Sequence, residues 1–175
     1  MSDNAFVQPQ TTFTPSKKDI AAAAPGVLSA ARWFWWIAGL SVVNTVLIHS
    51  GSDTSFVVGL GFTMFADVLF KSVKAVAFGI DAVAILFFFL MGRYALRGHL
   101  WAFIVGGVVY AGDALIYLYF KDYMPLAFHA FALFQIGRGA FTLRTCLRDA
   151  EALSFTAPVA AAATATPPEL PTQQS

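Results

Sequence analysis

Residues 100–120 read LWAFIVGGVVYAGDALIYLYF, a run in which Asp113 is the only charged side chain. A helix of about 20 apolar residues is long enough to cross the ~30 Å hydrocarbon core of a bilayer. Trp101 opens the run and Tyr117 and Tyr119 close it, as aromatic residues do at membrane interfaces. The stretch therefore predicts a transmembrane helix with one buried carboxylate.

Three further apolar runs have a similar length, and they cover residues 31–49, 75–91 and 124–143. The chain of 175 residues is 58% hydrophobic and only 12% charged, whereas soluble domains carry about 25% charged residues. The sequence therefore predicts an all-α integral membrane protein with four transmembrane helices, whose main partner is the lipid bilayer. The net charge of +1 gives no indication of a nucleic-acid partner.

The segments on either side of these runs have a different composition. Residues 1–28 and 149–175 are rich in Ala, Thr, Pro and polar residues, which favours disordered tails around a membrane domain of residues 29–148. Basic residues gather on the side of the membrane that carries both tails: Lys17, Lys18, Arg32, Arg93, Arg97, Arg144 and Arg148. The positive-inside rule then predicts that both termini are cytoplasmic.

The segment between the first two spans allows two interpretations. Apolar residues recur at helical spacing over residues 62–73, after a turn-forming stretch at residues 50–61. We expect a short interfacial or re-entrant helix on the outer side of the membrane. The alternative is a fifth span, which would move the C-terminal arginines to the outer side.

Each predicted span has a polar residue in its outer half, and in chain order these four residues are Asn44, Asp81, Asp113 and His129. At about 1.5 Å per residue, each lies roughly 7–11 Å below the outer boundary of the membrane. A bundle of four helices can therefore bring these side chains together. Tyr110 and Tyr117 share a helix face with Asp113, so their hydroxyl groups are candidate hydrogen-bond donors to its carboxylate.

This predicted polar cluster has more than one interpretation. Ionisable residues inside a membrane are costly, and they usually face a protein interior or a wet cavity. The groups either hydrogen-bond one another to hold the helices in register, or form a proton, ion or small-ligand site. A third arrangement, in which the helices face different ways, leaves no cluster at all.

Cofactor and metal chemistry receive little support from the sequence. The single cysteine, Cys146, excludes an intrachain disulfide and a multi-cysteine metal site. His49 and His129 lie on different predicted spans and are candidate haem ligands, because two such histidines can bind haem iron. We predict no catalytic residue and no metal site.

Several short stretches resemble a group of small four-span bacterial inner-membrane proteins. They are WIAGL (36–40), SGSDTSF (50–56), WAF (101–103) with Tyr110 and DAL (113–115), and HAF (129–131). The resemblance covers roughly residues 32–146. It implies a four-span topology and a location in the bacterial inner membrane, and it implies no reaction.

The sequence thus favours a non-enzymatic accessory or binding protein that acts with a second copy of itself or with another membrane protein. One alternative is an ion- or proton-coupled transport site, or a small-ligand site, built from Asp81, Asp113 and His129. Another is a haem- or quinone-linked redox subunit.

Overall fold

The computed structural model describes residues 15–49, 61 and 74–164. These residues form helices and no strand: α1 (Lys17–Ala23), α2 (Pro25–His49), α4 (Lys74–Leu96), α5 (Leu100–Tyr119) and α6 (Tyr123–Thr164). Each of the last four is long and apolar enough to cross a membrane. The prediction of an all-helical chain with four such helices is therefore confirmed.

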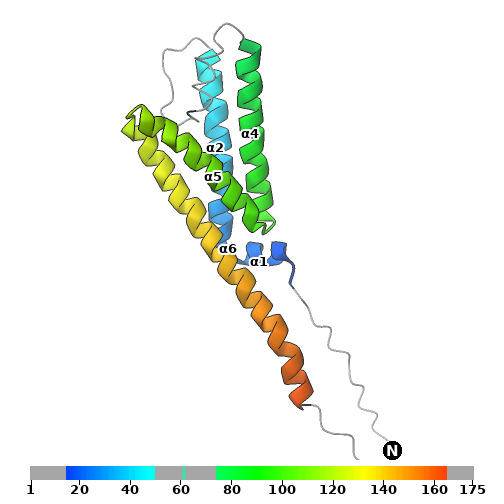
Figure 1. Ribbon diagram of the computed structural model, residues 1–175. Helices are drawn as coiled ribbons and strands as arrows, with labels where there is room; N and C mark the ends of the chain where they lie inside the picture. The colour runs from blue at the N-terminus through cyan, green and yellow to red at the C-terminus, as the bar shows by residue number, and fades with distance from the viewer. Residues whose placement is uncertain (1–14, 50–60, 62–73, 165–175) are drawn as a thin grey trace, which may run out of the picture.

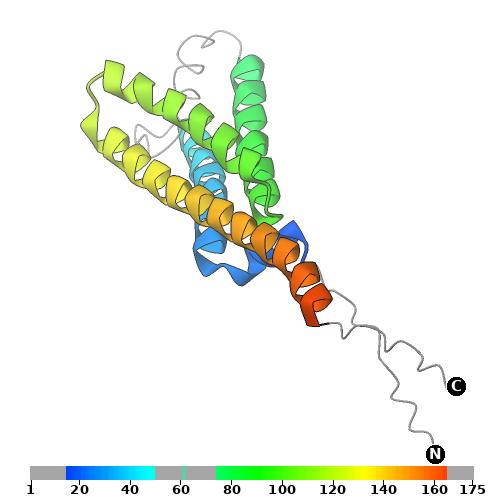
Figure 2. The same ribbon diagram turned by 60° about the horizontal axis from the view of Figure 1, so that its bottom comes forward.

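The four long helices form a bundle that is tighter on one side than on the other (Figure 1). Helix α2 packs along α4 and α6, and α5 packs against α6. Helices α4 and α5 diverge from the turn that joins them (Figure 1). Helix α6 continues well past α1, at the end of the bundle where the chain enters it (Figure 2).

The same backbone motif ends both α4 and α5. After α4, His99 N–H donates to the Tyr94 carbonyl, and Gly98 takes a φ of +78°. After α5, Asp122 N–H donates to the Tyr117 carbonyl, and Lys121 takes a φ of 57°. A left-handed residue after the last turn satisfies carbonyls that the helix leaves open, which is why each hairpin closes within a few residues.

Helix α1 closes the end of the bundle at the α4–α5 turn. Ser16 starts it with a capping box, in which the Ser16 hydroxyl accepts from the Asp19 N–H and the Asp19 carboxylate accepts from the Ser16 N–H. The Ser16 hydroxyl also donates to that carboxylate over 2.6 Å. This hydrogen bond, together with one from the Ser16 N–H, holds the pKa of the exposed Asp19 carboxyl below its usual range. A side chain at Gly98 would overlap the Lys17 carbonyl, so glycine allows α1 to approach this closely.

Aromatic rings fill the centre of the bundle. Phe34 of α2 is fully buried between Phe88 of α4 and Phe103 of α5, with ring centroids 6.4 and 5.9 Å away. A side chain at Gly106 would overlap the Phe34 ring. Tyr110 extends the same column, edge-on to Phe88 at 5.8 Å. The column therefore runs from the core toward the predicted polar residues of α5.

The helix boundaries differ from the expected ones at both ends of the chain. Helix α1 and the start of α2 at Pro25 fall in the range 1–28 that was expected to be a disordered tail. Burial of Ala21 and Val27 explains this order, since their methyl groups belong to the core. Helix α6 runs to Thr164, past the expected boundary at residue 148, through an alanine-rich sequence that favours helix. The interfacial helix predicted at residues 62–73 lies outside the described residues.

Candidate functional site

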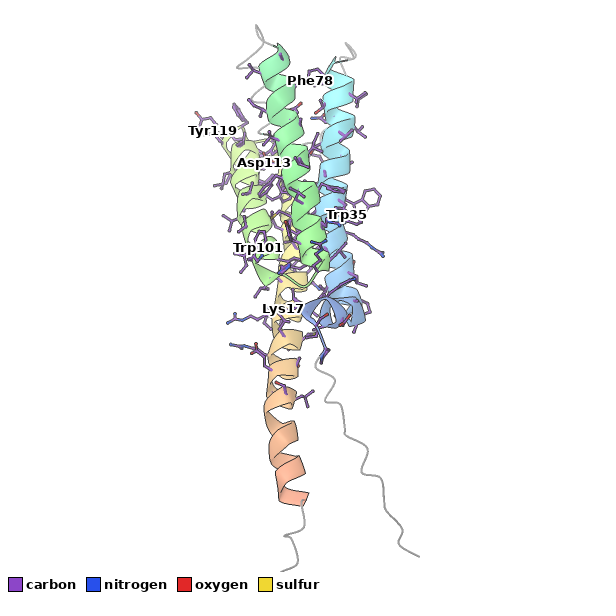
Figure 3. The ribbon with its side chains drawn as sticks, turned by 90° about the vertical axis from the view of Figure 1, so that its right-hand side faces the viewer. Lys17, Trp35, Phe78, Trp101, Asp113 and Tyr119 are labelled. Atoms are coloured by element: carbon purple, nitrogen blue, oxygen red, sulfur yellow. The ribbon has the colours of Figure 1, made fainter. Side chains whose placement is uncertain are left out.

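The centre of the site is a buried pair of side chains from α5 and α6. Asp113 Oδ2 lies 2.8 Å from His129 Nε2. The pair is well removed from solvent, because Asp113 is 6% exposed and His129 is 0% exposed. Figure 3 shows Asp113 inside the bundle, between the end marked by Lys17 and the end marked by Phe78.

Hydrogen bonding determines how many protons the pair holds. His129 Nδ1 lies 2.8 Å from the carbonyl oxygen of Pro125, one helical turn earlier. A carbonyl can only accept, so Nδ1 carries a proton and Nε2 faces Asp113. The 2.8 Å contact then requires one proton between Nε2 and Oδ2. The proton lies either on His129, as an imidazolium facing a carboxylate, or on Asp113, as a carboxylic acid facing an imidazole. In both forms the pair is neutral overall, which suits an apolar environment.

Two tyrosines hold the His129 ring in its orientation. Tyr110 stacks on the imidazole at a centroid distance of 4.4 Å and an interplanar angle of 15°. Tyr117 approaches it at 5.0 Å and 47°. The sequence predicted both tyrosines beside Asp113, and the structure adds ring contacts with its histidine partner. Such contacts limit rotation of the ring and keep Nε2 directed at the carboxylate.

A backbone group from the segment between α2 and α4 also reaches the pair. Gly61 is buried, and its N–H donates to Asp113 Oδ2 over 3.0 Å. A side chain at this position would overlap the Tyr117 ring, so only glycine brings its backbone so close to the carboxylate. Asp113 therefore receives hydrogen bonds from two separate parts of the chain.

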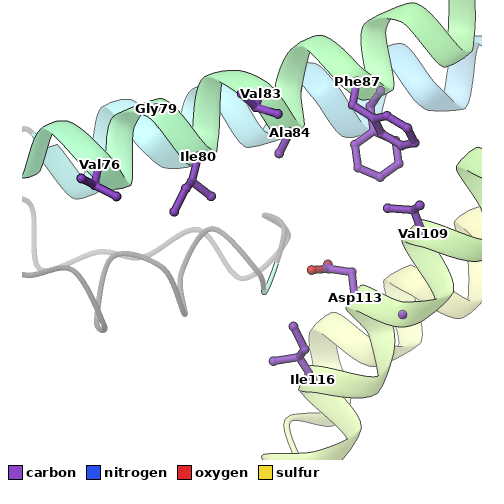
Figure 4. Close-up of a pocket in the computed structure, with 11 residues that line it drawn as sticks. Val76, Gly79, Ile80, Val83, Ala84, Phe87, Val109, Asp113 and Ile116 are labelled. Atoms are coloured by element: carbon purple, nitrogen blue, oxygen red, sulfur yellow. The ribbon is translucent and has the colours of Figure 1, made fainter.

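An apolar groove adjoins the pair. It lies between α4 and α5 and encloses about 890 Å³, within the ~300–1,000 Å³ typical of small-molecule sites. Figure 4 shows the Asp113 carboxylate pointing from α5 into the space between the two helices. Asp113 is the one charged residue in the described lining. That lining consists of Val76, Gly79, Ile80, Val83, Ala84, Phe87, Phe88, Val109, Gly112, Asp113 and Ile116. Val83 and Val109 are exposed, so the groove opens on the outer surface of the bundle.

Asp81 belongs to a different interface. It receives a hydrogen bond of 2.8 Å from the Thr45 hydroxyl, which links α4 to α2. Asn44, 1% exposed, makes no side-chain hydrogen bond with the described residues. Of the four residues predicted to converge, the structure pairs Asp113 with His129, and it pairs Asp81 with a threonine that the sequence analysis did not select.

His129 is one of the two candidate haem ligands. Both ring nitrogens of His129 already have partners, Pro125 O and Asp113 Oδ2, so neither is directed at an iron atom. The described part of the chain contains no group of three or more His, Cys, Asp or Glu side chains arranged for a metal ion. For His49 the structure describes only its place as the last residue of α2.

Sequence reasoning missed three parts of the site: the Pro125 carbonyl, the Gly61 N–H and the Thr45 hydroxyl. Pro125 precedes His129 by four residues, and this spacing was a usable signal for a contact within one helix. Thr45 follows Asn44 directly and was not selected, because hydroxyl groups are common in membrane helices.

No family model, no curated protein and no solved structure matches this chain.

Proposed function

We propose that this protein is a multi-pass membrane protein that binds a neutral, largely apolar molecule from the bilayer, with the Asp113–His129 pair as the polar anchor. The observation that carries the proposal is the position of the pair. One buried carboxylate, already hydrogen-bonded to a histidine, borders an apolar groove of about 890 Å³. The ligand would carry a carbonyl or hydroxyl head on an apolar body.

The exposed side chains support residence in a membrane. Trp101 is exposed at the start of α5, toward the α1 end of the bundle, and Tyr119 and Tyr123 are exposed at the opposite end. Two such aromatic belts mark the interfaces of a bilayer. Basic residues gather at the α1 end, which supports cytoplasmic termini: Lys17, Lys18, Arg93, Arg97, Arg144 and Arg148. We extend this to the bacterial inner membrane on the resemblance described above.

The chemistry of the groove selects the ligand class. Its apolar lining favours a ligand with a hydrocarbon or aromatic body. Because lipid and groove are equally apolar, transfer from one to the other gains little, and the affinity of the body depends on how well it packs. The head supplies most of the specificity, because a polar group that finds a partner inside the membrane avoids the penalty of an unsatisfied hydrogen bond. The Asp113 carboxylate can accept from a ligand hydroxyl, and it can donate to a ligand carbonyl when the shared proton leaves its bond to His129 for the oxygen that faces the groove.

Proton-coupled exchange of a lipophilic cation is the second candidate. The pair is neutral with one proton, so a monovalent organic cation can take the place of that proton without leaving a net charge in the groove. Phe87 and Phe88 line the groove and offer ring faces to such a cation. In this mechanism binding would release a proton, whereas a neutral ligand would release none.

A substitution that fills the groove tests both candidates. A Cβ atom added at Gly112 meets no atom within 4 Å, and Gly112 lines the groove, so the ring of Gly112→Phe would occupy groove space. We expect wild-type protein in lipid nanodiscs to bind decyl-benzoquinone saturably by calorimetry, and Gly112→Phe to weaken that binding at least about tenfold, or about 1.4 kcal/mol. Tetraphenylphosphonium, tested in parallel with proton release, probes the cation alternative.

The matched control is Gly137→Phe on α6. This glycine also has open space around it, and it does not line the groove. The proposal requires Gly137→Phe to bind the quinone as the wild type does. Equal binding by both phenylalanine variants would show that the probe only partitions into lipid and that the groove is not a binding site.

A further inference from the structure

A small polar notch lies on the other side of the bundle, between α2 and α6. It encloses about 60 Å³, room for a few water molecules, since about 10–15 Å³ of such space holds one. Its lining comes from the first turns of α2 and the middle of α6: Gly26, Ser29, Ala30, Gln135, Arg138 and Thr142. None of these residues belongs to the Asp113–His129 site.

The notch results from a close crossing of two helices. A side chain at Gly139 would overlap the Ala30 methyl group, so α2 and α6 approach there almost backbone to backbone. Ser29 lies directly beside Ala30 in the chain, and Arg138 directly beside Gly139. Small residues at the crossing thus bring Ser29 and Arg138 to the edge of the same notch.

Arg138 lacks an acidic partner among the described residues. The salt bridge found in that part of the chain joins Asp113 to His129, and the Arg138 guanidinium lies instead 5.9 Å from the centroid of the Phe134 ring. Arg138 is 15 residues after Tyr123, the first residue of α6, or about 22 Å along a helix that crosses ~30 Å of hydrocarbon. From its position over Phe134, the flexible side chain can turn toward the membrane interface at the α1 end, where phospholipid headgroups lie.

We propose that this notch binds the phosphate ester of an anionic phospholipid in the leaflet at the α1 end. Arg138 supplies a planar pair of N–H donors suited to phosphate oxygens, and Ser29 and Gln135 supply neutral donors beside it. The N–H groups of Val27 and Leu28 donate to the Ala24 carbonyl, so these two groups are not free to bind a headgroup. A negative headgroup provides the counter-charge that the described residues do not.

Lipid binding to purified protein tests this assignment. Phosphatidylglycerol added to phosphatidylcholine micelles should raise the unfolding temperature of wild-type protein, and native mass spectrometry should detect one retained phosphatidylglycerol. Arg138→Gln should weaken that retention by about fivefold. Ser29→Leu, which keeps every charge but blocks the notch, should also weaken it. Arg144→Gln removes an equal charge from an exposed position outside the notch and should retain the lipid.

Three outcomes would overturn the assignment. Equal loss in Arg138→Gln and Arg144→Gln would show diffuse attraction to a basic surface. Retention by Ser29→Leu would show that the notch is not used. If inorganic phosphate reproduced the thermal shift and displaced the lipid, the ligand would be free phosphate and not a headgroup. Should Arg138→Gln fail to fold, the comparison of Ser29→Leu with Arg144→Gln still decides the result.

Discussion

The α2–α4 and α4–α5 interfaces each contain one buried carboxylate, yet they are built differently. Along α2–α4, the Trp35 ring stacks on Phe89 at 5.9 Å and donates a hydrogen bond to its carbonyl, so the helices lie in close contact. Between α4 and α5 an apolar groove remains, and Asp113 lies on its wall. The setting of a buried carboxylate, rather than its burial, therefore separates a packing role from the proposed binding role.

The largest effect is expected when the Asp113–His129 pair is broken. His129→Ala leaves Asp113 with a charge or proton that has lost its partner, and removal of one member of a buried pair typically costs about 3–5 kcal/mol. We expect a loss of that size in the free energy of unfolding, measured by denaturation in mixed micelles. His99→Ala, at the turn between α4 and α5, is the control and should change it little.

The next largest effect tests the closed packing around Phe34. Gly106→Ala places a methyl group into the buried Phe34 ring, and overpacking of this kind costs about 1–3 kcal/mol. The same denaturation measurement applies. An unchanged free energy of unfolding would mean that the aromatic column is looser than described.

A moderate effect is expected at the α2–α4 polar pair. Thr45→Val keeps the shape of the side chain and removes the hydroxyl that donates to Asp81, at a cost of about 1 kcal/mol. Thr145→Val is the matched control, because its hydroxyl binds only a carbonyl of its own helix. If Thr45→Val altered quinone binding without altering stability, the division of roles between the two interfaces would be wrong.

The smallest effect is expected in the open groove, and it has the opposite sign. Gly112→Ala adds a methyl group to open space on α5, and alanine favours a helix over glycine by about 0.5–1 kcal/mol. We expect a small gain in the free energy of unfolding. A loss like that of Gly106→Ala would show that the groove is closed in solution.

The sequence predicted the helices well where composition alone decides them. Residues 100–120 and α5, Leu100–Tyr119, agree within one residue, because an apolar run of that length between aromatic residues has few alternatives. The residues around Asp113 were also predictable, since spacings of three and four residues define one helix face. The start of α2 at Pro25 was less predictable, because small residues such as Ala30 become buried only when a partner helix packs against them.

The partners of the polar residues could not be predicted from the sequence. Depth in the membrane suggested that Asn44, Asp81, Asp113 and His129 share one layer, but depth does not determine the direction in which each helix face points. The rotation of α4 places Asp81 against Thr45 of α2, whereas α5 presents Asp113 to His129 of α6. The Gly61 N–H is a backbone donor, so no pattern of side chains in the sequence predicts its contact with Asp113.

The most direct test of the central claim replaces both members of the pair at once. In Asp113→Leu/His129→Leu no charge is left unpaired, and apolar replacement of a buried pair is often neutral for stability. We expect the free energy of unfolding to fall by no more than about 3 kcal/mol, the cost of leaving the buried Gly61 N–H without its acceptor, together with a loss of decyl-benzoquinone affinity of at least about tenfold in nanodiscs. A stable double variant that binds the quinone as tightly as the wild type would contradict the assignment of the pair as a ligand anchor.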